Sequence, residues 1–97
     1  MSRIDELNRK VTQAIYEAEN SNSPDKWIKV AGLEDELAMI PSLSDRERTI
    51  AIRGAVNAAL KARDYRMAEN FGRKYASGDH QIQPILDSYK KRFENQN

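Results

Sequence analysis

The chain has 97 residues, which is enough for one domain with one modest core and little room for a buried active-site cavity. It carries 16 basic and 15 acidic side chains, for a net charge of +1, so it lacks the strong positive balance of a typical nucleic-acid-binding domain. The absence of cysteine excludes disulfides and thiolate-bound metals.

The first predicted helix runs from about Ser2 to Glu19. Ser2 is placed to cap its N-terminus, and acidic residues follow in the first turn, where the helix dipole favours negative charge. Apolar residues recur with the spacing of one helical face: Ile4, Leu7, Val11, Ala14, Ile15 and Ala18. The spacing is close to a heptad, so this face packs either on its own bundle or on a second copy of the chain. The polar residues 20–23 then form a loop.

The second predicted helix follows Ser23, its N-cap, and has Pro24 at the first helical position, where a missing N–H costs nothing. Pro41 ends it. Its apolar stripe consists of Trp27, Val30, Leu33, Leu37 and Ile40. The solvent-facing side is expected to carry three consecutive acids, Glu34, Asp35 and Glu36. Successive helical residues point about 100° apart, so these three carboxylates cannot converge on one cation.

The third predicted helix, about residues 45–62, has a complete start signal. Ser44 and Glu47 form the S-x-x-E pattern of a capping box, which satisfies amide donors at a helix N-terminus. Two adjoining apolar faces follow: a bulky stripe of Ile52, Val56 and Leu60, and a smooth stripe of Ala51, Ala55, Ala58 and Ala62. Small side chains let helices approach closely, so we expect this helix to lie between two neighbours.

The fourth predicted helix, about residues 64–77, follows with almost no loop. Asp64 is suited to begin it and Gly78 to end it, since a left-handed cap is easiest without a Cβ atom. A fifth helix is predicted from Pro84 to about Glu94 on the basis of its apolar stripe.

These elements predict the fold class. No segment alternates apolar and polar residues with the period of a strand over a useful length. We therefore expect an all-α protein, a compact bundle of four to five helices built on a central antiparallel αα-hairpin. Residues 1–97 form a single domain, and residues 95–97 fray at the C-terminus.

The hairpin of the third and fourth helices carries a pattern of its own, in Asp64, Tyr65, Ala68, Phe71 and Ala76. The pattern resembles the turn and second helix of a tetratricopeptide-type (TPR-like) repeat, over about residues 44–77. This resemblance implies two helices packed antiparallel, in a family whose arrays form a groove that binds peptides. Arg63 stands where that family often has glycine. A generic αα-hairpin would explain the same residues.

The residues that usually carry catalysis are scarce. His80 is the single histidine, and an exposed loop or capping role is favoured over that of a general base or metal ligand. The four glycines stand singly, so no phosphate-binding loop is present. We therefore expect no enzyme activity, no catalytic residue, no metal and no cofactor.

The compartment is predicted from two patterns. The polar opening lacks the apolar core of a signal peptide, and no apolar run approaches the roughly 18 residues of a membrane span. Both favour a cytoplasmic protein without membrane attachment.

Charge is distributed unevenly along the chain. Residues 1–45 hold five basic and nine acidic side chains, a balance of −4, and residues 46–97 hold eleven basic and six acidic, a balance of +5. Either the two halves attract one another, or the basic half faces an acidic partner. The candidate binding residues on the third and fourth helices are Arg46, Arg53, Arg63, Arg66, Arg73 and Lys74.

The sequence thus favours a small non-catalytic module that binds a protein partner or forms a homodimer. The alternative is a nucleic-acid-binding accessory protein that uses the six basic residues, because arginine and lysine neutralise phosphates. Aromatic residues fall on the expected core faces, and no recognition-helix pattern is visible.

Overall fold

The computed structural model describes residues 2–75. Within that part of the chain the elements are, in order, α1 (Arg3–Ser21), α2 (Pro24–Ala38), α3 (Asp45–Lys61) and α4 (Tyr65–Tyr75). The all-α prediction is confirmed. The expectations for Gly78, His80, the helix from Pro84 and the frayed C-terminus lie outside the described residues.

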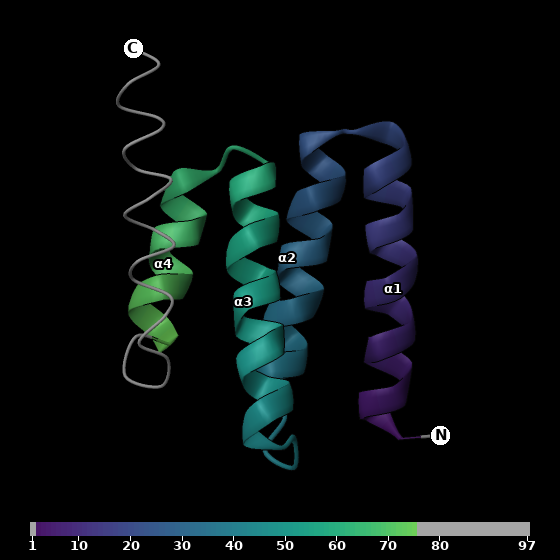
Figure 1. Cartoon of the computed structure of the whole chain (residues 1–97), viewed down its shortest axis with the longest axis vertical. Coiled ribbons are helices and arrows are strands. Elements are labelled where there is room, and N and C mark those ends of the chain that lie inside the picture. Colours follow the sequence, from purple (N-terminus) through teal and green to yellow (C-terminus); the bar gives the residue numbers. More distant parts are fainter. Residues whose placement is uncertain (1, 76–97) are drawn as a thin grey trace.

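The helices stand side by side in chain order and alternate in direction (Figure 1). Packing follows the same order: α1 contacts α2, α2 contacts α3, and α3 contacts α4. The prediction that α3 lies between two neighbours is therefore confirmed. No helix in residues 2–75 is both long and apolar enough to cross a membrane.

The core is centred on the interface of α2 and α3. Val30 of α2 and Val56 of α3 are the largest side chains that are fully enclosed. Alanines of α3 fill the space around them, and their small size permits close approach of the helix axes. The apolar stripe of α1 contains the buried residues Leu7, Val11, Ala14 and Ala18. Among the described helices, α1 packs on α2 alone.

Helix α1 is capped at both ends by its own sequence. The Ser2 hydroxyl accepts a hydrogen bond from the Asp5 amide at 3.1 Å, as predicted. At the other end Asn22 adopts the left-handed conformation, with φ of 51°, and its amide donates to the Ala18 carbonyl. The helix continues through Ser21, so the connection to α2 is two residues rather than the predicted loop of 20–23.

The connection from α2 to α3 is held by one arginine. Arg48, in the first turns of α3, donates from Nε to the Ala38 carbonyl at 3.1 Å. Its Nη2 atom lies within hydrogen-bond distance of three further carbonyl oxygens in that connection, those of Ile40 at 2.8 Å, Pro41 at 3.3 Å and Leu43 at 3.2 Å. The guanidinium thus binds the carbonyl of the last residue of α2 and three carbonyls of the connection that follows, where the regular helical hydrogen-bond pattern has ended.

The capping box at the start of α3 is confirmed with a change of partner. The Ser44 hydroxyl accepts from the Glu47 amide at 3.1 Å, as the pattern predicts. The Glu47 carboxylate, however, accepts from the Ser44 hydroxyl at 2.9 Å. Ser44 and Glu47 are therefore joined by two hydrogen bonds, one to the Glu47 amide and one to its carboxylate, which together close the first turn of α3.

The turn between α3 and α4 is a Schellman motif at Arg63. The Asp64 amide donates to the Ala59 carbonyl at 3.0 Å, and the Arg63 amide donates to the Leu60 carbonyl at 2.9 Å. Arg63 has a φ of 59°, in the left-handed region that favours glycine. Asp64 then caps α4 by accepting from the Met67 amide at 3.0 Å, as predicted.

We expect Arg63→Gly to stabilise the protein by about 1 kcal/mol, because glycine adopts the left-handed conformation without the Cβ clash. Arg63→Ala is the matched control, since it removes the same side chain but retains the Cβ atom. Chemical denaturation of both variants measures the difference. Equal unfolding free energies for the two variants would contradict the account.

Candidate functional site

The six predicted binding residues spread over the full length of the α3–α4 hairpin. Arg46 is exposed in the first turn of α3, and Arg53 is half-buried one heptad further on. Arg63 is exposed at the turn, and Arg66 is exposed in the first turn of α4. Arg46 and Arg63 lie at opposite ends of α3, about 25 Å apart at 1.5 Å per residue. The six side chains therefore do not converge on one point.

Arg73 and Lys74, the two of these residues in the last turn of α4, pair with carboxylates. Arg73 binds Glu69 of the same helix, with Nη2 to Oε1 at 2.8 Å, which is the predicted i, i+4 pair. Lys74 binds Asp35 of α2, with Nζ to Oδ1 at 3.0 Å. These pairs reduce the positive field along α4. The Lys74 pair also joins the acidic half of the sequence to the basic half, which is the internal attraction that the charge pattern suggested.

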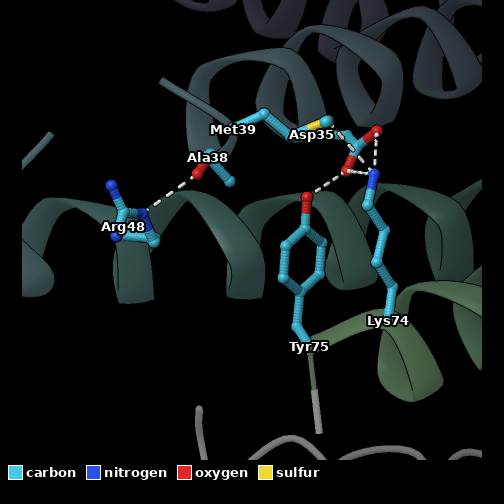
Figure 2. Close-up of polar contacts among 6 residues, drawn as sticks. All are labelled: Asp35, Ala38, Met39, Arg48, Lys74 and Tyr75. Atoms are coloured by element: carbon cyan, nitrogen blue, oxygen red, sulfur yellow. Dashed lines mark hydrogen bonds and ion pairs between the residues drawn. The ribbon is translucent and has the colours of Figure 1, made fainter. Parts of the chain in front are cut away.

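The end of α4 is tied to α2 through Asp35 (Figure 2). The Tyr75 hydroxyl and the Lys74 ammonium both donate to the Asp35 carboxylate. The Lys74 ammonium also lies 3.2 Å from the Met39 sulfur. Burial and the bond to Asp35 raise the pKa of Tyr75 above its usual range, so the phenol stays protonated. These contacts reach past α3 and fix the described end of α4 against α2.

The acidic run on α2 is not the solvent-facing group predicted from the sequence. Asp35 is half-buried and binds α4, while Glu36 is exposed and forms an ion pair with Arg3 of α1 at 2.8 Å. Glu34 is buried, with only 8% of its surface exposed. The 100° step between successive residues sends each carboxylate in a different direction, as predicted. The prediction that all three face solvent holds for Glu36, is wrong for Glu34 and holds only in part for Asp35.

Glu34 is buried because it lies in the middle of the α2 core stripe. Val30 and Ala31 precede it by four and three residues, and Leu37 and Ala38 follow it by three and four. These are the spacings of one helical face. The helical spacing of Glu34 therefore indicates the core face, whereas its charge indicates the solvent side, and in this structure the spacing prevails.

A glycine on the facing helix makes room for this carboxyl group. A Cβ atom built on Gly54 of α3 would lie 1.5 Å from Oε2 of Glu34 and 2.6 Å from its Cδ. Any side chain at position 54 would therefore exclude Glu34 from its present place. Glu34 of α2 and Gly54 of α3 therefore pack directly against each other across the helix interface.

The Glu34 carboxyl group forms no hydrogen bond or ion pair with a described residue. None of the described side-chain oxygen or nitrogen atoms that are sealed from solvent lacks a partner, so the carboxyl oxygens of this buried residue keep some contact with solvent. Burial raises its pKa from the usual 4.5 to about 7. An acid with this pKa is partly protonated at neutral pH. Buried ionisable groups without partners are uncommon in structural cores and concentrate at functional sites.

Glu34 faces a hollow of about 240 Å³ between α1, α2 and α3. We call it the Glu34 hollow. Its wall is mostly apolar, with two further polar groups: Asn8 from α1 and Glu47 from α3. The residues that line it are Asn8, Glu34, Leu37, Leu43, Glu47, Ile50 and Ala51. Ile50 is a large apolar residue that is 59% exposed.

A second hollow, of about 380 Å³, lies between α1 and α2. Its charged residues are Lys10, Glu17 and Lys29, of both signs, and Lys10 is paired with Glu6 at 3.3 Å. It contains no buried ionisable group. Among residues 2–75, no cluster of histidine, cysteine, aspartate and glutamate is arranged to hold a metal ion.

No protein family, curated protein or solved structure matches this chain. The chemistry of the Glu34 hollow and of the basic residues is therefore the basis for assigning a function.

Proposed function

We propose that this chain is a small non-catalytic protein-interaction module that binds its partner at the Glu34 hollow. The hollow supports this proposal by combining apolar walls, an exposed Ile50 at the surface and a buried polar group. A few polar groups placed in an otherwise apolar depression are the usual chemistry of recognition. The TPR-like resemblance of the α3–α4 hairpin is in keeping with such a role, and Ala68, its small-residue position, is fully buried.

Self-association is a second form of the same proposal. The near-heptad stripe of α1 packs on α2 in the monomer, so a dimer made through this stripe requires α1 to leave its place. Light scattering distinguishes binding of another protein from self-association, since a monomeric mass at high protein concentration would exclude the homodimer.

The rival function is nucleic-acid binding through the six basic residues of α3 and α4, Arg46, Arg53, Arg63, Arg66, Arg73 and Lys74. The ion pairs of Arg73 and Lys74 weigh against it, because an approaching phosphate must compete with Glu69 and Asp35. Labelled RNA and DNA, titrated at low and near-physiological salt, test this function. Phosphate contacts release counterions, so binding of this kind must weaken steeply as salt rises.

We expect short random peptides displayed on phage to yield binders of the wild-type chain that fail to bind Ile50→Asp. A charge at this position disfavours burial of an apolar partner against the hollow. Tyr16→Asp is the matched control, because Tyr16 is 64% exposed and lies on α1 outside the hollow. Calorimetry measures the affinity of each selected peptide for the three proteins.

Two outcomes would contradict the proposal. Binders that tolerate Ile50→Asp place the interaction elsewhere on the molecule. The rival function replaces the proposal if no peptide is selected and the chain binds nucleic acid in a salt-sensitive way. That binding should be lost in the double variant Arg63→Glu/Arg66→Glu.

A further inference from the structure

The Glu34 hollow has the chemistry of a site for a single cationic side chain. Glu34 is more than nine-tenths buried and lines the hollow without a partner. An isolated buried carboxylate is costly, and an opposite charge seated next to it removes much of that cost. No lysine or arginine is among the described residues that line the hollow. Arg48 is bound to the α2–α3 connection, and Arg3 is bound to Glu36 at the surface.

The shape of the hollow favours a long cationic side chain. Leu37, Leu43 and Ala51 offer an apolar wall for an alkyl stem. Beyond the wall, the Glu34 carboxylate can accept from a charged head group, and Asn8 and Glu47 supply further acceptors around it. The hollow thus combines two carboxyl groups, those of Glu34 and Glu47, with apolar side walls.

We infer that the Glu34 hollow receives an arginine side chain of a partner protein. Guanidinium is more weakly hydrated than ammonium, so it enters a mostly apolar hollow at lower cost. Its planar fork can bind one carboxylate with two parallel N–H donors and has donors left for Asn8 and Glu47. This inference rests on the proposed interaction function and specifies what the partner presents.

Gly54 leaves the space that the Glu34 carboxyl group occupies. Because the carboxyl group lies where any Cβ atom at position 54 would stand, Gly54→Ala must displace it. The variant is therefore expected to weaken arginine binding while all residues that line the hollow are unchanged. Gly32 of α2, whose Cβ atom would meet nothing within 4 Å, is the matched control as Gly32→Ala.

The test uses N-acetylarginine methylamide and its neutral isostere N-acetylcitrulline methylamide, followed by NMR through the side-chain carboxyl carbon of Glu34. We expect the arginine probe to bind in the millimolar range and the citrulline probe at least tenfold more weakly, because only the former carries charge. Glu34→Gln should abolish binding, whereas Glu36→Gln, two residues away on the same helix, should leave it unchanged.

The pH dependence gives an independent readout. With the pKa of Glu34 at about 7, roughly nine-tenths of the carboxyl is ionised near pH 8 and one-tenth near pH 6. The apparent affinity for the arginine probe should therefore fall about tenfold between these values. The other charged group lining the hollow is Glu47 of α3, while α1 contributes the neutral Asn8. The Glu47→Gln variant should retain the pH dependence.

Three results would overturn the inference: no change at the Glu34 carboxyl up to the solubility limit of the probe, equal binding of the citrulline probe, or tighter binding of the matching lysine derivative. These failures are distinct from failure of the interaction function. If the displayed peptides depend on Ile50 but not on Glu34, the chain is an interaction module whose partner does not insert an arginine. If the arginine probe binds but no peptide is selected, the hollow binds arginine but the proposed protein-interaction function is wrong.

Discussion

Glu34→Gln should make the protein more stable at high pH and leave its stability nearly unchanged at low pH. The pKa of Glu34 is raised by burial from 4.5 to about 7, so the folded state binds this proton more tightly than the unfolded state. The wild type therefore loses stability as pH rises from about 4.5 through 7, because the buried carboxyl must ionise. Glutamine stays neutral throughout and does not incur this loss.

The expected gain well above pH 7 is on the order of 3 kcal/mol, since the pKa rises by about 2.5 units and each unit corresponds to about 1.4 kcal/mol. Urea denaturation of wild type and variant at about pH 5 and pH 8 measures it. Glu36→Gln is the control, since that carboxylate is exposed and paired with Arg3, and should follow the wild type within about 0.5 kcal/mol. Parallel curves for Glu34→Gln and wild type would contradict the burial of an unpaired acid.

Arg48→Met should destabilise the protein by about 2–3 kcal/mol, because it removes one charged donor group from four backbone carbonyls. Methionine retains an unbranched apolar stem, so the loss reports on the hydrogen bonds rather than on packing. A loss of this size in a chain of this length lowers the melting temperature by roughly 10 °C or more.

Two variants control for this interpretation. Arg46→Met removes a charge from the same turn of α3, but Arg46 is exposed and should change stability by no more than about 0.5 kcal/mol. Arg48→Lys should recover part of the loss, since one ammonium group cannot reach all four carbonyls. If Arg48→Met unfolds at the same denaturant concentration as Arg46→Met, the arginine does not hold the connection.

The helices could be predicted because their signals are local. The caps at Ser2, Ser44 and Asp64 each depend on residues within three positions, and the structure has all three hydrogen bonds. The small-residue stripe of α3 also predicted correctly that this helix lies between two others. These features follow from helical geometry alone, which is fixed before any helix meets its neighbour.

The Glu34 hollow could not be predicted because it depends on three helices at once. The helical spacing indicates that Glu34 lies on the core face of α2, but the place of its carboxyl group depends on Gly54 of the facing helix. Nothing in the sequence indicates that positions 34 and 54 are opposite one another. The same holds for Arg48, whose partners are carbonyls placed by the path of the connection rather than by their residue types. Predicting these contacts requires the register between helices, which is a tertiary property.

The chain-ordered packing has a consequence for how this protein folds. Connections of two, six and three residues join successive described helices, and each helix-on-helix packing interface among them is between helices joined in this way. The side-chain contacts of Lys74 and Tyr75 with Asp35 are the exception, because they join α4 to α2. Every interface therefore forms by closing a short loop, which loses little chain entropy compared with bringing distant segments together. Such a topology favours rapid folding, because the contacts that hold the helices together are local in the sequence.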